Sequence, residues 1–373
     1  MARHRKIKLS AFSERVNIMK RNASLDIIRS LAIFLVLCVH SVLNGKFTAG
    51  PITGVGGYIM MGLWLMMSSC VPLFLMLSGH LLNMKKPTIK YYINYLHIFI
   101  PYVLISIITL IFRTEYLHVE MTVRSFVGDI ANFSGCLYSW YLMLYTGLYL
   151  LIPFLNAMYH ALETKRQKLL LIFSFFALSH LPSLVNSYIN IYSVWWKNLY
   201  PVTFYLLGAY CSEYPSAKKP SFYFRWLVGL LVVFSIYDVF YLHGDGGRAP
   251  YYGYENYQVL LVCFLIFRGI SSLDIEKLPS GFIKCTEIVS KLSFYIFLLS
   301  GITDDILYPI VAANVADYYL NYGYFIPTAI ISFTAALLLS IPLYPIGEWL
   351  SKRCIALVNR LIDRLTNRTA AAN

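Results

Sequence analysis

The chain has 373 residues, of which 58% are hydrophobic and 13% are charged. Soluble domains carry about 25% charged residues, so this composition excludes an ordinary soluble protein and indicates an integral membrane protein. The formal net charge of +13 does not indicate nucleic-acid binding, because membrane orientation explains the pattern of the basic residues.

The first 23 residues are basic, and no small-residue cleavage site follows the first apolar run. We therefore expect residues 1–23 to form an uncleaved cytoplasmic segment rather than a signal peptide. The seven cysteines show no metal-type spacing, and most of them fall within apolar runs or on basic loops. We expect reduced packing residues, with neither a disulfide framework nor a metal site.

The first apolar run, residues 24–43, contains the ionisable residues Asp26, Arg29 and His40. Ionisable groups inside a bilayer are costly, so they are candidates for a functional site. On a helix, Arg29 and His40 lie about 16 Å apart along the axis and about 20° apart around it, so they share one face. One residue can hold a ligand near a membrane surface while the other acts near mid-depth or beyond.

Ten apolar runs predict an all-α integral membrane protein with about ten transmembrane helices in one domain, residues 24–345. The fifth, sixth and eighth runs are short, so we expect broken or steeply packed helices there. The runs lie at 24–43, 58–82, 92–112, 137–158, 168–182, 199–212, 223–243, 256–270, 287–309 and 324–345.

The basic residues are distributed unevenly between the two sides of the predicted domain. Of the 31 lysines and arginines, 25 lie in the termini and the even-numbered connections, five lie in the odd-numbered connections, and one is Arg29. By the positive-inside rule, both termini are cytoplasmic and the number of spans is even. Lys86 should then lie on the cytoplasmic side and Gly246 on the opposite side.

The predicted outer connections 113–136, 183–198 and 244–255 are rich in Tyr, Trp, Asn and Gly. Two interpretations remain open, an interfacial aromatic belt or a platform on which sugar rings stack. In residues 346–373, apolar residues recur at helical spacing with Arg and Lys between them. This pattern predicts an amphipathic helix on the cytoplasmic leaflet.

Several motifs follow one another along the chain and resemble those of the acyltransferase-3 family of membrane O-acyltransferases. The first, Leu25-Asp26-x-x-Arg29-x10-His40, resembles the opening signature of that family. The later motifs are VPLFLMLSGHLL at 71–82, YINYLHIFIP at 92–101, SWYLMLYTGLYLLIP at 139–153, FYLLG at 204–208 and LSFYI at 292–296. The resemblance covers residues 24 to about 300 and implies a ten-span fold.

Two motifs depart from the family pattern. Where the third-span motif usually carries two arginines, this chain has Asn94 and His97, and Ser300 replaces a late histidine. The roles of those family residues are therefore not carried over. The resemblance implies transfer of an acyl group, usually acetyl from cytoplasmic acetyl-CoA, to a hydroxyl of a cell-surface glycan or lipid-linked sugar. It also implies the surface-polysaccharide or lipopolysaccharide O-acetylation type of enzyme, in the bacterial inner membrane.

Acyl transfer to a sugar hydroxyl requires a base, because an unassisted alcohol is a weak nucleophile. The resemblance favours His40 for that role, and the alternative is a buried histidine that hydrogen-bonds a neighbouring helix. Arg29 would bind the phosphate or pantetheine carbonyl groups of acyl-CoA, or it would extend to lipid phosphate. Asp26, one turn before Arg29, would join the catalytic group or form an ion pair within the helix.

Further polar residues in or beside the apolar runs are candidates for substrate binding. Tyr92 and His97 would help to hold acyl-CoA near the cytoplasmic side, and Asp304 or Asp305 would orient His40 if their helices meet. For Ser78, close helix packing is the alternative role. The candidates for the acceptor side are Arg113, Glu115 and Trp140.

Three functions are compatible with these residues: an O-acyltransferase, a proton-coupled exporter, and a non-catalytic partner in polysaccharide assembly. The chain shows no internal repeat of the kind that many transporters have. For the first function, the expected partners are acyl-CoA as donor, a glycan or lipid-linked sugar as acceptor, and membrane lipids. We expect no metal and no nucleic acid.

Overall fold

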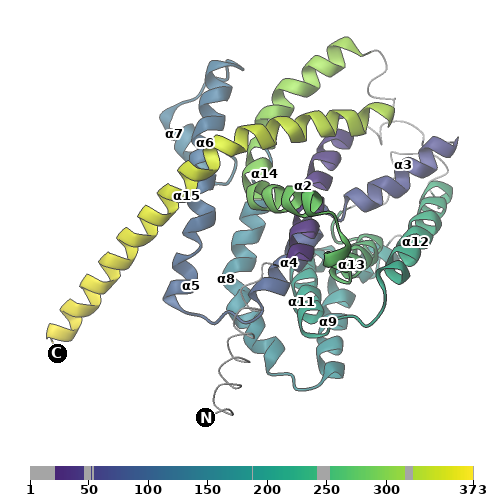
Figure 1. Ribbon diagram of the computed structural model, residues 1–373, viewed down its shortest axis with the longest axis horizontal. Helices are drawn as coiled ribbons and strands as arrows, with labels where there is room; N and C mark the ends of the chain where they lie inside the picture. The colour runs from purple at the N-terminus through teal and green to yellow at the C-terminus, as the bar shows by residue number, and fades with distance from the viewer. Residues whose placement is uncertain are drawn as a thin grey trace.

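The computed structural model describes residues 22–45, 52, 54–186, 188–241, 253–315 and 322–372. The basic segment 1–21, Lys46, Gly246 and Arg248 lie outside the described residues. Within those ranges the chain forms helices and loops and no strand (Figure 1). The elements are α2 Ala23–Asn44, α3 Gly54–Met67, α4 Cys70–Leu82, α5 Ile89–Ile93, α6 Leu96–Glu115, α7 Val123–Ala131, α8 Trp140–His160, α9 Lys165–Ser179, α10 Leu181–Val185, η2 Val194–Leu199, α11 Tyr200–Glu213, α12 Pro220–Tyr241, α13 Tyr257–Ser271, η4 Ile275–Lys277, α14 Ser280–Asn314, η5 Tyr322–Tyr324 and α15 Phe325–Ala372.

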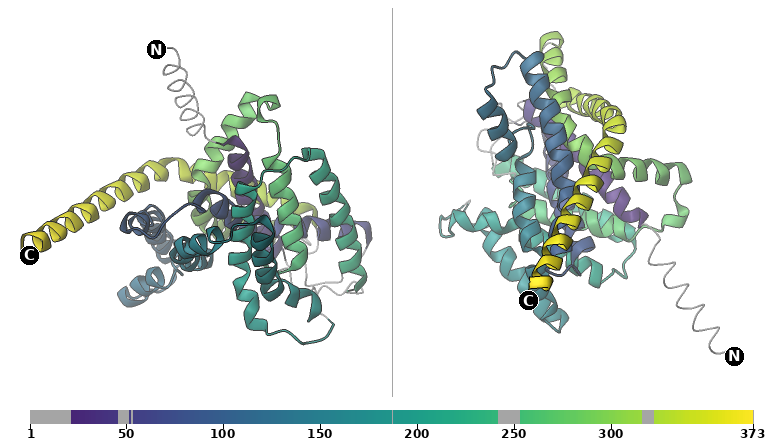
Figure 2. Two further views of the ribbon diagram at one scale, coloured as in Figure 1. Left: turned by 90° about the horizontal axis from the view of Figure 1, so that it is seen from below. Right: turned by 90° about the vertical axis from the view of Figure 1, so that its left-hand side faces the viewer.

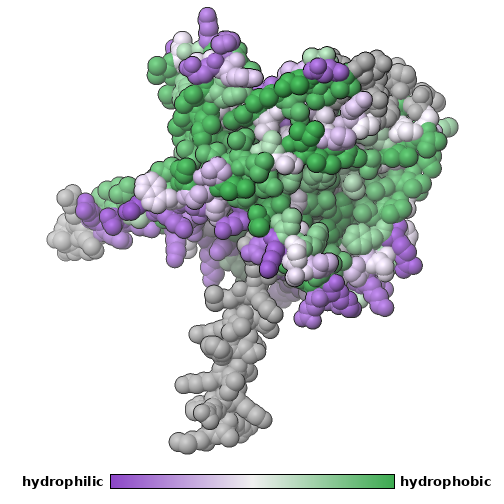
Figure 3. Space-filling view, turned by 45° about the horizontal axis from the view of Figure 1, so that its top comes forward, coloured by the Kyte–Doolittle hydropathy of each residue, from purple (hydrophilic) through white to green (hydrophobic). Residues whose placement is uncertain are grey.

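The all-α membrane class that the sequence predicts is confirmed. Seven helical stretches in the described part of the chain are long and apolar enough to cross a membrane: Ala23–Asn44, Gly54–Leu82, Ile89–Glu115, Trp140–His160, Pro220–Phe240, Ser280–Asn314 and Phe325–Leu365. A broad apolar band with hydrophilic residues above and below it crosses the face in Figure 3.

The three short runs form α9, α11 and α13, which have 15, 14 and 15 residues. At 1.5 Å per residue these helices are about 22 Å long, shorter than a hydrocarbon layer of about 30 Å. We expected broken or steeply packed helices at these runs, and the fifth run is interrupted at His180, between α9 and α10. The count of ten spans and the sides of the termini stay predictions.

The core of the bundle is built around α2. This helix packs against α14, α4 and α15, so elements from both ends of the sequence meet at it. Its first turn is capped by Asn22, whose side chain accepts a hydrogen bond from the backbone N–H of Ser24. Asp26 and His40 are buried in this packing, whereas Arg29 is partly exposed. Burial within the protein is the usual location of ionisable groups in membrane helices.

α4 and α11 approach each other so closely that only glycine fits at two positions. A Cβ on Gly79 would overlap the carbonyl oxygen of Tyr205, and a Cβ on Gly208 would overlap the carbonyl oxygen of Met76. Small residues allow helix backbones in membranes to come this close. The seven cysteines are free thiols, and five of them are buried, as the sequence predicts.

Candidate active site

His40 lies beside a carboxylate that comes from a helix far along the chain. The residue is 6% exposed, and its Nδ1 lies 3.2 Å from Oδ2 of Asp304 on α14. This is an ion-pair distance, although the ring N–H is not aligned for a hydrogen bond. Of the two aspartates predicted to reach His40, Asp304 is the one that contacts it. Oδ2 of Asp305 instead lies 3.5 Å from Nε of Arg113.

The Asp304 carboxylate is held from two sides. Ser332 Oγ on α15 donates to Oδ1 at 2.6 Å, and the Tyr138 hydroxyl donates to Oδ2 at 2.9 Å. Ser332 Oγ also lies 2.9 Å from Thr303 Oγ1. Because donors from separate elements hold it, the orientation of the carboxylate toward His40 is set by helix packing.

Tyr138 covers one face of the His40 ring. The two rings are stacked, with centroids 3.4 Å apart and an interplanar angle of 18°. The same phenol donates to Oδ2 of Asp304, so one side chain contacts both members of the pair.

A cavity of about 360 Å³ adjoins this group of residues, and we call it the outer cavity. Two carboxylates and two phenol rings lie in its wall, so it can hydrogen-bond a ligand that carries hydroxyl groups. Its lining residues are Asn44, Leu137, Tyr138, Asp304, Asp305, Tyr308, Pro309 and Ala312.

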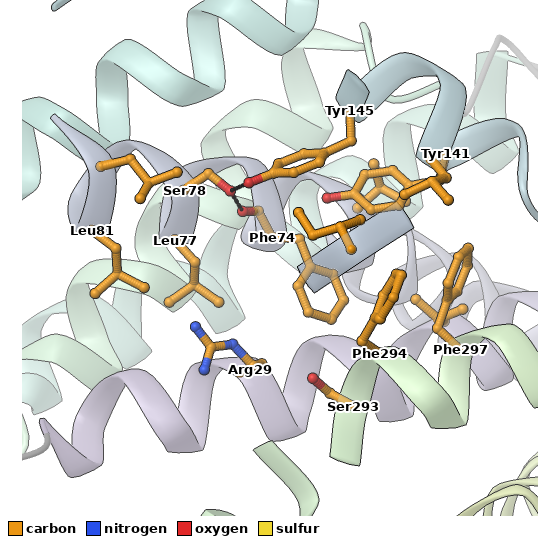
Figure 4. Close-up of a pocket in the computed structure, with 15 residues that line it drawn as sticks. Arg29, Phe74, Leu77, Ser78, Leu81, Tyr141, Tyr145, Ser293, Phe294 and Phe297 are labelled. Carbon is orange, nitrogen blue, oxygen red and sulfur yellow. Dashed lines mark hydrogen bonds between the residues drawn. The ribbon is translucent and has the colours of Figure 1, made fainter. Parts of the chain in front are cut away.

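A second cavity, also about 360 Å³, begins at Arg29, and we call it the arginine cavity. In Figure 4 the Arg29 guanidinium points from α2 toward Leu77 and Leu81, while Phe294, Phe297 and Tyr141 lie at the other end. Its wall is largely apolar. The lining residues are Arg29, Val36, Val71, Phe74, Leu77, Ser78, Leu81, Leu82, Ile98, Tyr141, Leu142, Tyr145, Ser293, Phe294 and Phe297.

His40 lines neither cavity, but it lies on α2 between residues that line one and a residue that lines the other. Along one face of α2, Arg29 and Val36 line the arginine cavity, and Asn44 lines the outer cavity. His40 is one turn after Val36 and one turn before Asn44, so it falls between the two sets of lining residues. One face of α2 therefore contributes residues to two separate cavities.

The polar residues at the N-terminal end of α2 contact a serine that sequence reasoning missed. Ser290 Oγ donates to Oδ1 of the buried Asp26 at 2.6 Å, and Arg29 lies 3.2 Å from the same Ser290 oxygen. Arg29 also lies 4.0 Å from Asp26 within the helix. Asp26 therefore makes the predicted contact with Arg29, and it also joins α2 to α14.

Ser78 lines the arginine cavity, where its hydroxyl donates to Phe74 O and lies 3.4 Å from the Tyr145 hydroxyl (Figure 4). Arg113 reaches the outer cavity through its contact with Asp305. Trp140 is 41% exposed and stacks on Tyr254 at 5.7 Å.

The structure does not bring Tyr92, His97 or Glu115 into the lining of either cavity. His97 and Glu115 are exposed, and Tyr92 packs edge-on against Tyr91.

Asp238 is a buried carboxylate on α12, and it accepts a hydrogen bond from Gln258 at 2.8 Å. No group of three or more His, Cys, Asp or Glu side chains in the described ranges could hold a metal ion.

Sequence reasoning also missed Tyr138 and Ser332, which hold Asp304. Tyr138 precedes the tryptophan-led motif that begins at Ser139, and its position there is the one signal that could have indicated it. Ser332 stands in an apolar run where a single serine is ordinary, so nothing local distinguishes it.

Comparison with known proteins identifies one family. A family model described as "Acyltransferase domain" matches residues 22–345, which contain both cavities and His40. No curated protein and no solved structure matches the chain.

Proposed function

Because the chain belongs to the acyltransferase-3 family, we propose that it is a membrane O-acyltransferase that uses His40 as its general base. In this proposal the donor is acyl-CoA from the cytoplasm, usually acetyl-CoA, and the acceptor is a hydroxyl of a cell-surface glycan or lipid-linked sugar. The protein would act in the inner membrane of a bacterium. The family and the apolar helices support a multi-pass membrane acyltransferase.

The observation that carries the proposal is the position of His40, in contact with Asp304 and between two cavities. The carboxylate lies at Nδ1, which leaves Nε2 as the ring nitrogen for a substrate. A histidine held in this way can take a proton and stay oriented while it is charged. An arrangement in which donor and acceptor enter from opposite sides keeps water away from the reacting atoms.

The reaction balances as a direct transfer. Nε2 of His40 takes the proton of the acceptor hydroxyl while the hydroxyl oxygen attacks the thioester carbonyl carbon. The carbon–oxygen ester bond forms, the carbon–sulfur bond breaks, and His40 returns the proton to the departing CoA sulfur. Asp304 stabilises the transient imidazolium, since its carboxylate lies 3.2 Å away.

The arginine cavity suits the donor. A guanidinium binds phosphate or carbonyl oxygens at the inner end, and the apolar wall accepts the flexible arm of the donor. Arg29 and His40 are separated by about 16 Å of helix, so an extended arm held at Arg29 can present its thioester near His40. The outer cavity, with its carboxylates and phenols, suits a hydroxyl-rich acceptor.

A transfer assay in isolated membranes tests this function. Membranes that contain the wild-type chain or His40→Ala at equal protein level receive acetyl-CoA labelled in the acetyl group, and mass spectrometry locates the label in glycan and lipid fractions. We expect O-acetylation that His40→Ala abolishes. His118→Asn is the control, because His118 is exposed and has a φ of 54°, which asparagine tolerates. Transfer that persists in His40→Ala would contradict the role of His40, and no transfer by the wild type would contradict the donor.

A further inference from the structure

The distal half of α15 is a feature that acyl transfer does not use. The helix contains Pro342 and Pro345, and beyond them it leaves the body of the protein (Figures 1 and 2). Its first 21 residues, 325–345, make about 32 Å of helix, enough to cross a hydrocarbon layer of about 30 Å. Residues 346–365 therefore extend beyond the part that a membrane crossing requires.

Residues 346–365, which we call the distal segment, have one apolar face. At about 100° per residue, five residues fall within an arc of about 100°. Leu357 and Leu361 are each 57% exposed, so the protein does not bury this face. The five residues of the arc are Ile346, Leu350, Leu357, Leu361 and Leu365.

Three arginines lie along one edge of the apolar face. Arg353, Arg360 and Arg364 fall within an arc of about 40°, and Arg353 lies over the Trp349 ring at 5.6 Å. When the apolar face of a helix lies on a membrane, residues at its edge are level with the lipid headgroups. Guanidinium groups and a tryptophan are the side chains that favour this level.

The apolar and hydrophilic zones of the molecular surface both continue onto the distal segment. In Figure 3 the apolar side of the distal segment is continuous with the apolar band of the body, and its hydrophilic side follows the lower hydrophilic rim. A helix covered by another protein would have no reason to align its two faces with the two zones of the body. The alignment and the positive edge together indicate a lipid surface.

We propose that the distal segment is an interfacial helix that binds anionic phospholipid headgroups through Arg353, Arg360 and Arg364. A guanidinium pairs with a phosphate group through two parallel hydrogen bonds. Near an anionic leaflet, each such residue strengthens binding about fivefold. The segment thereby selects the lipids that surround the end of α15, independently of which substrate the enzyme transfers.

The test uses the full chain with Cys285 and Cys354 replaced by alanine, since the other five cysteines are buried. A single cysteine at Leu361 or at Asn359, on opposite faces, carries a fluorescent label in nanodiscs of phosphatidylcholine and phosphatidylglycerol. Spin-labelled lipids of either class then quench the label. We expect stronger quenching at 361 than at 359, and at least about threefold stronger quenching at 361 by phosphatidylglycerol than by phosphatidylcholine at equal mole fraction.

The arginines are tested by Arg353→Gln, Arg360→Gln and Arg364→Gln together. In this variant, the two lipids should quench the label at 361 equally. In Lys352→Gln, a change on the opposite face, phosphatidylglycerol should still quench it more strongly. Equal quenching at 361 and 359 would overturn the interfacial helix. Equal quenching by the two lipids in the wild-type segment, or protection of the 361 label from both lipids and water, would overturn the anionic headgroup as the occupant.

Discussion

A carboxylate is costly to bury in a helical bundle unless hydrogen-bond donors satisfy its oxygens. Asp304 meets this condition through Ser332 and Tyr138, and His40 lies against both Asp304 and the Tyr138 ring. These contacts hold His40 between Val36, which lines the arginine cavity, and Asn44, which lines the outer cavity. In the proposed function it acts there on both substrates, whereas a histidine used only for packing requires no cavity on either side.

The division of labour between Arg29 and His40 should be visible in steady-state kinetics. Arg29→Ala should raise the KM for acyl-CoA about 10- to 100-fold, the scale of charge-assisted hydrogen bonds, because Arg29 lines the arginine cavity, which we propose holds the donor. His40→Ala should instead lower kcat about 10²- to 10⁴-fold, as loss of a general base does. Arg29→Lys should restore KM only in part, because an ammonium cannot form paired bonds to phosphate. A lowered kcat with unchanged KM in Arg29→Ala would remove Arg29 from donor binding.

Asp304→Asn should lower kcat about 10²- to 10⁴-fold and leave the KM for acyl-CoA unchanged. The amide has the shape of the carboxylate but cannot stabilise the imidazolium, and it favours the wrong histidine tautomer. The control is Asp305→Asn, which contacts Arg113 rather than His40 and should spare the chemical step. Both variants are compared by thermal unfolding in detergent, so that a loss of folded protein is distinguished from a loss of catalysis. Wild-type kcat in Asp304→Asn would show that the contact only supports packing.

At the residue scale, the sequence identified the residues whose chemistry is unusual for a membrane helix. Asp26, Arg29 and His40 stand out because charge in an apolar run is costly. The partners Tyr138, Ser290 and Ser332 do not stand out, since tyrosine and serine are ordinary in such runs. His97 and Glu115 were predicted to bind substrate, yet both are exposed and outside the two cavities. Which polar residue turns inward depends on the rotation of each helix, which long-range packing decides.

At the scale of elements, the contact between α4 and α11 gives a stability prediction. Gly79→Ala should destabilise the protein by about 1–3 kcal/mol, because the new methyl group must push two backbones apart. Gly229→Ala on α12 is the matched control, with nothing within 4 Å of the added Cβ. That change should stabilise the helix by about 0.5–1 kcal/mol. Thermal unfolding in detergent measures both, and a neutral Gly79→Ala would show that α4 and α11 can separate without cost.

Hydropathy located the helices more reliably than it located their breaks. The run at 58–82 lies in one stretch long enough to cross a membrane, Gly54–Leu82, but the helix is interrupted at Ser68 and Ser69 between α3 and α4. Pro72 marks that break, because it has no N–H to bond the carbonyl of Ser68 and its ring crowds that carbonyl. The Ser68 hydroxyl bonds the preceding turn instead, at 2.9 Å from Trp64 O. Periodicity reports the burial of a segment, whereas a break depends on the neighbour against which each half packs.

At the scale of the whole molecule, the number of helices that cross the membrane depends on the short helices. α11 is short, but 11 of its 14 residues are buried, so protein rather than lipid surrounds it. A short helix enclosed in this way can cross within the bundle, because its exposed backbone ends meet protein or water-filled space rather than lipid. The uneven charge distribution in the sequence favours ten spans over seven.

Ten spans and seven spans differ in parity, and three positions report the difference. If ten helices cross, Lys86, Lys277 and Lys352 lie on the cytoplasmic side and Ile191 lies outside. If only the seven long helices cross, Lys277 and Lys352 lie outside, and Ile191 lies on the cytoplasmic side with Lys86. Single cysteines at these positions, in a background lacking Cys285 and Cys354, are labelled with an impermeant reagent in intact cells. We expect labelling at 191 alone, because the basic loops are retained on the cytoplasmic side. Labelling at 277 and 352 but not at 191 would establish seven spans, and would place the distal segment of α15 on the outer leaflet.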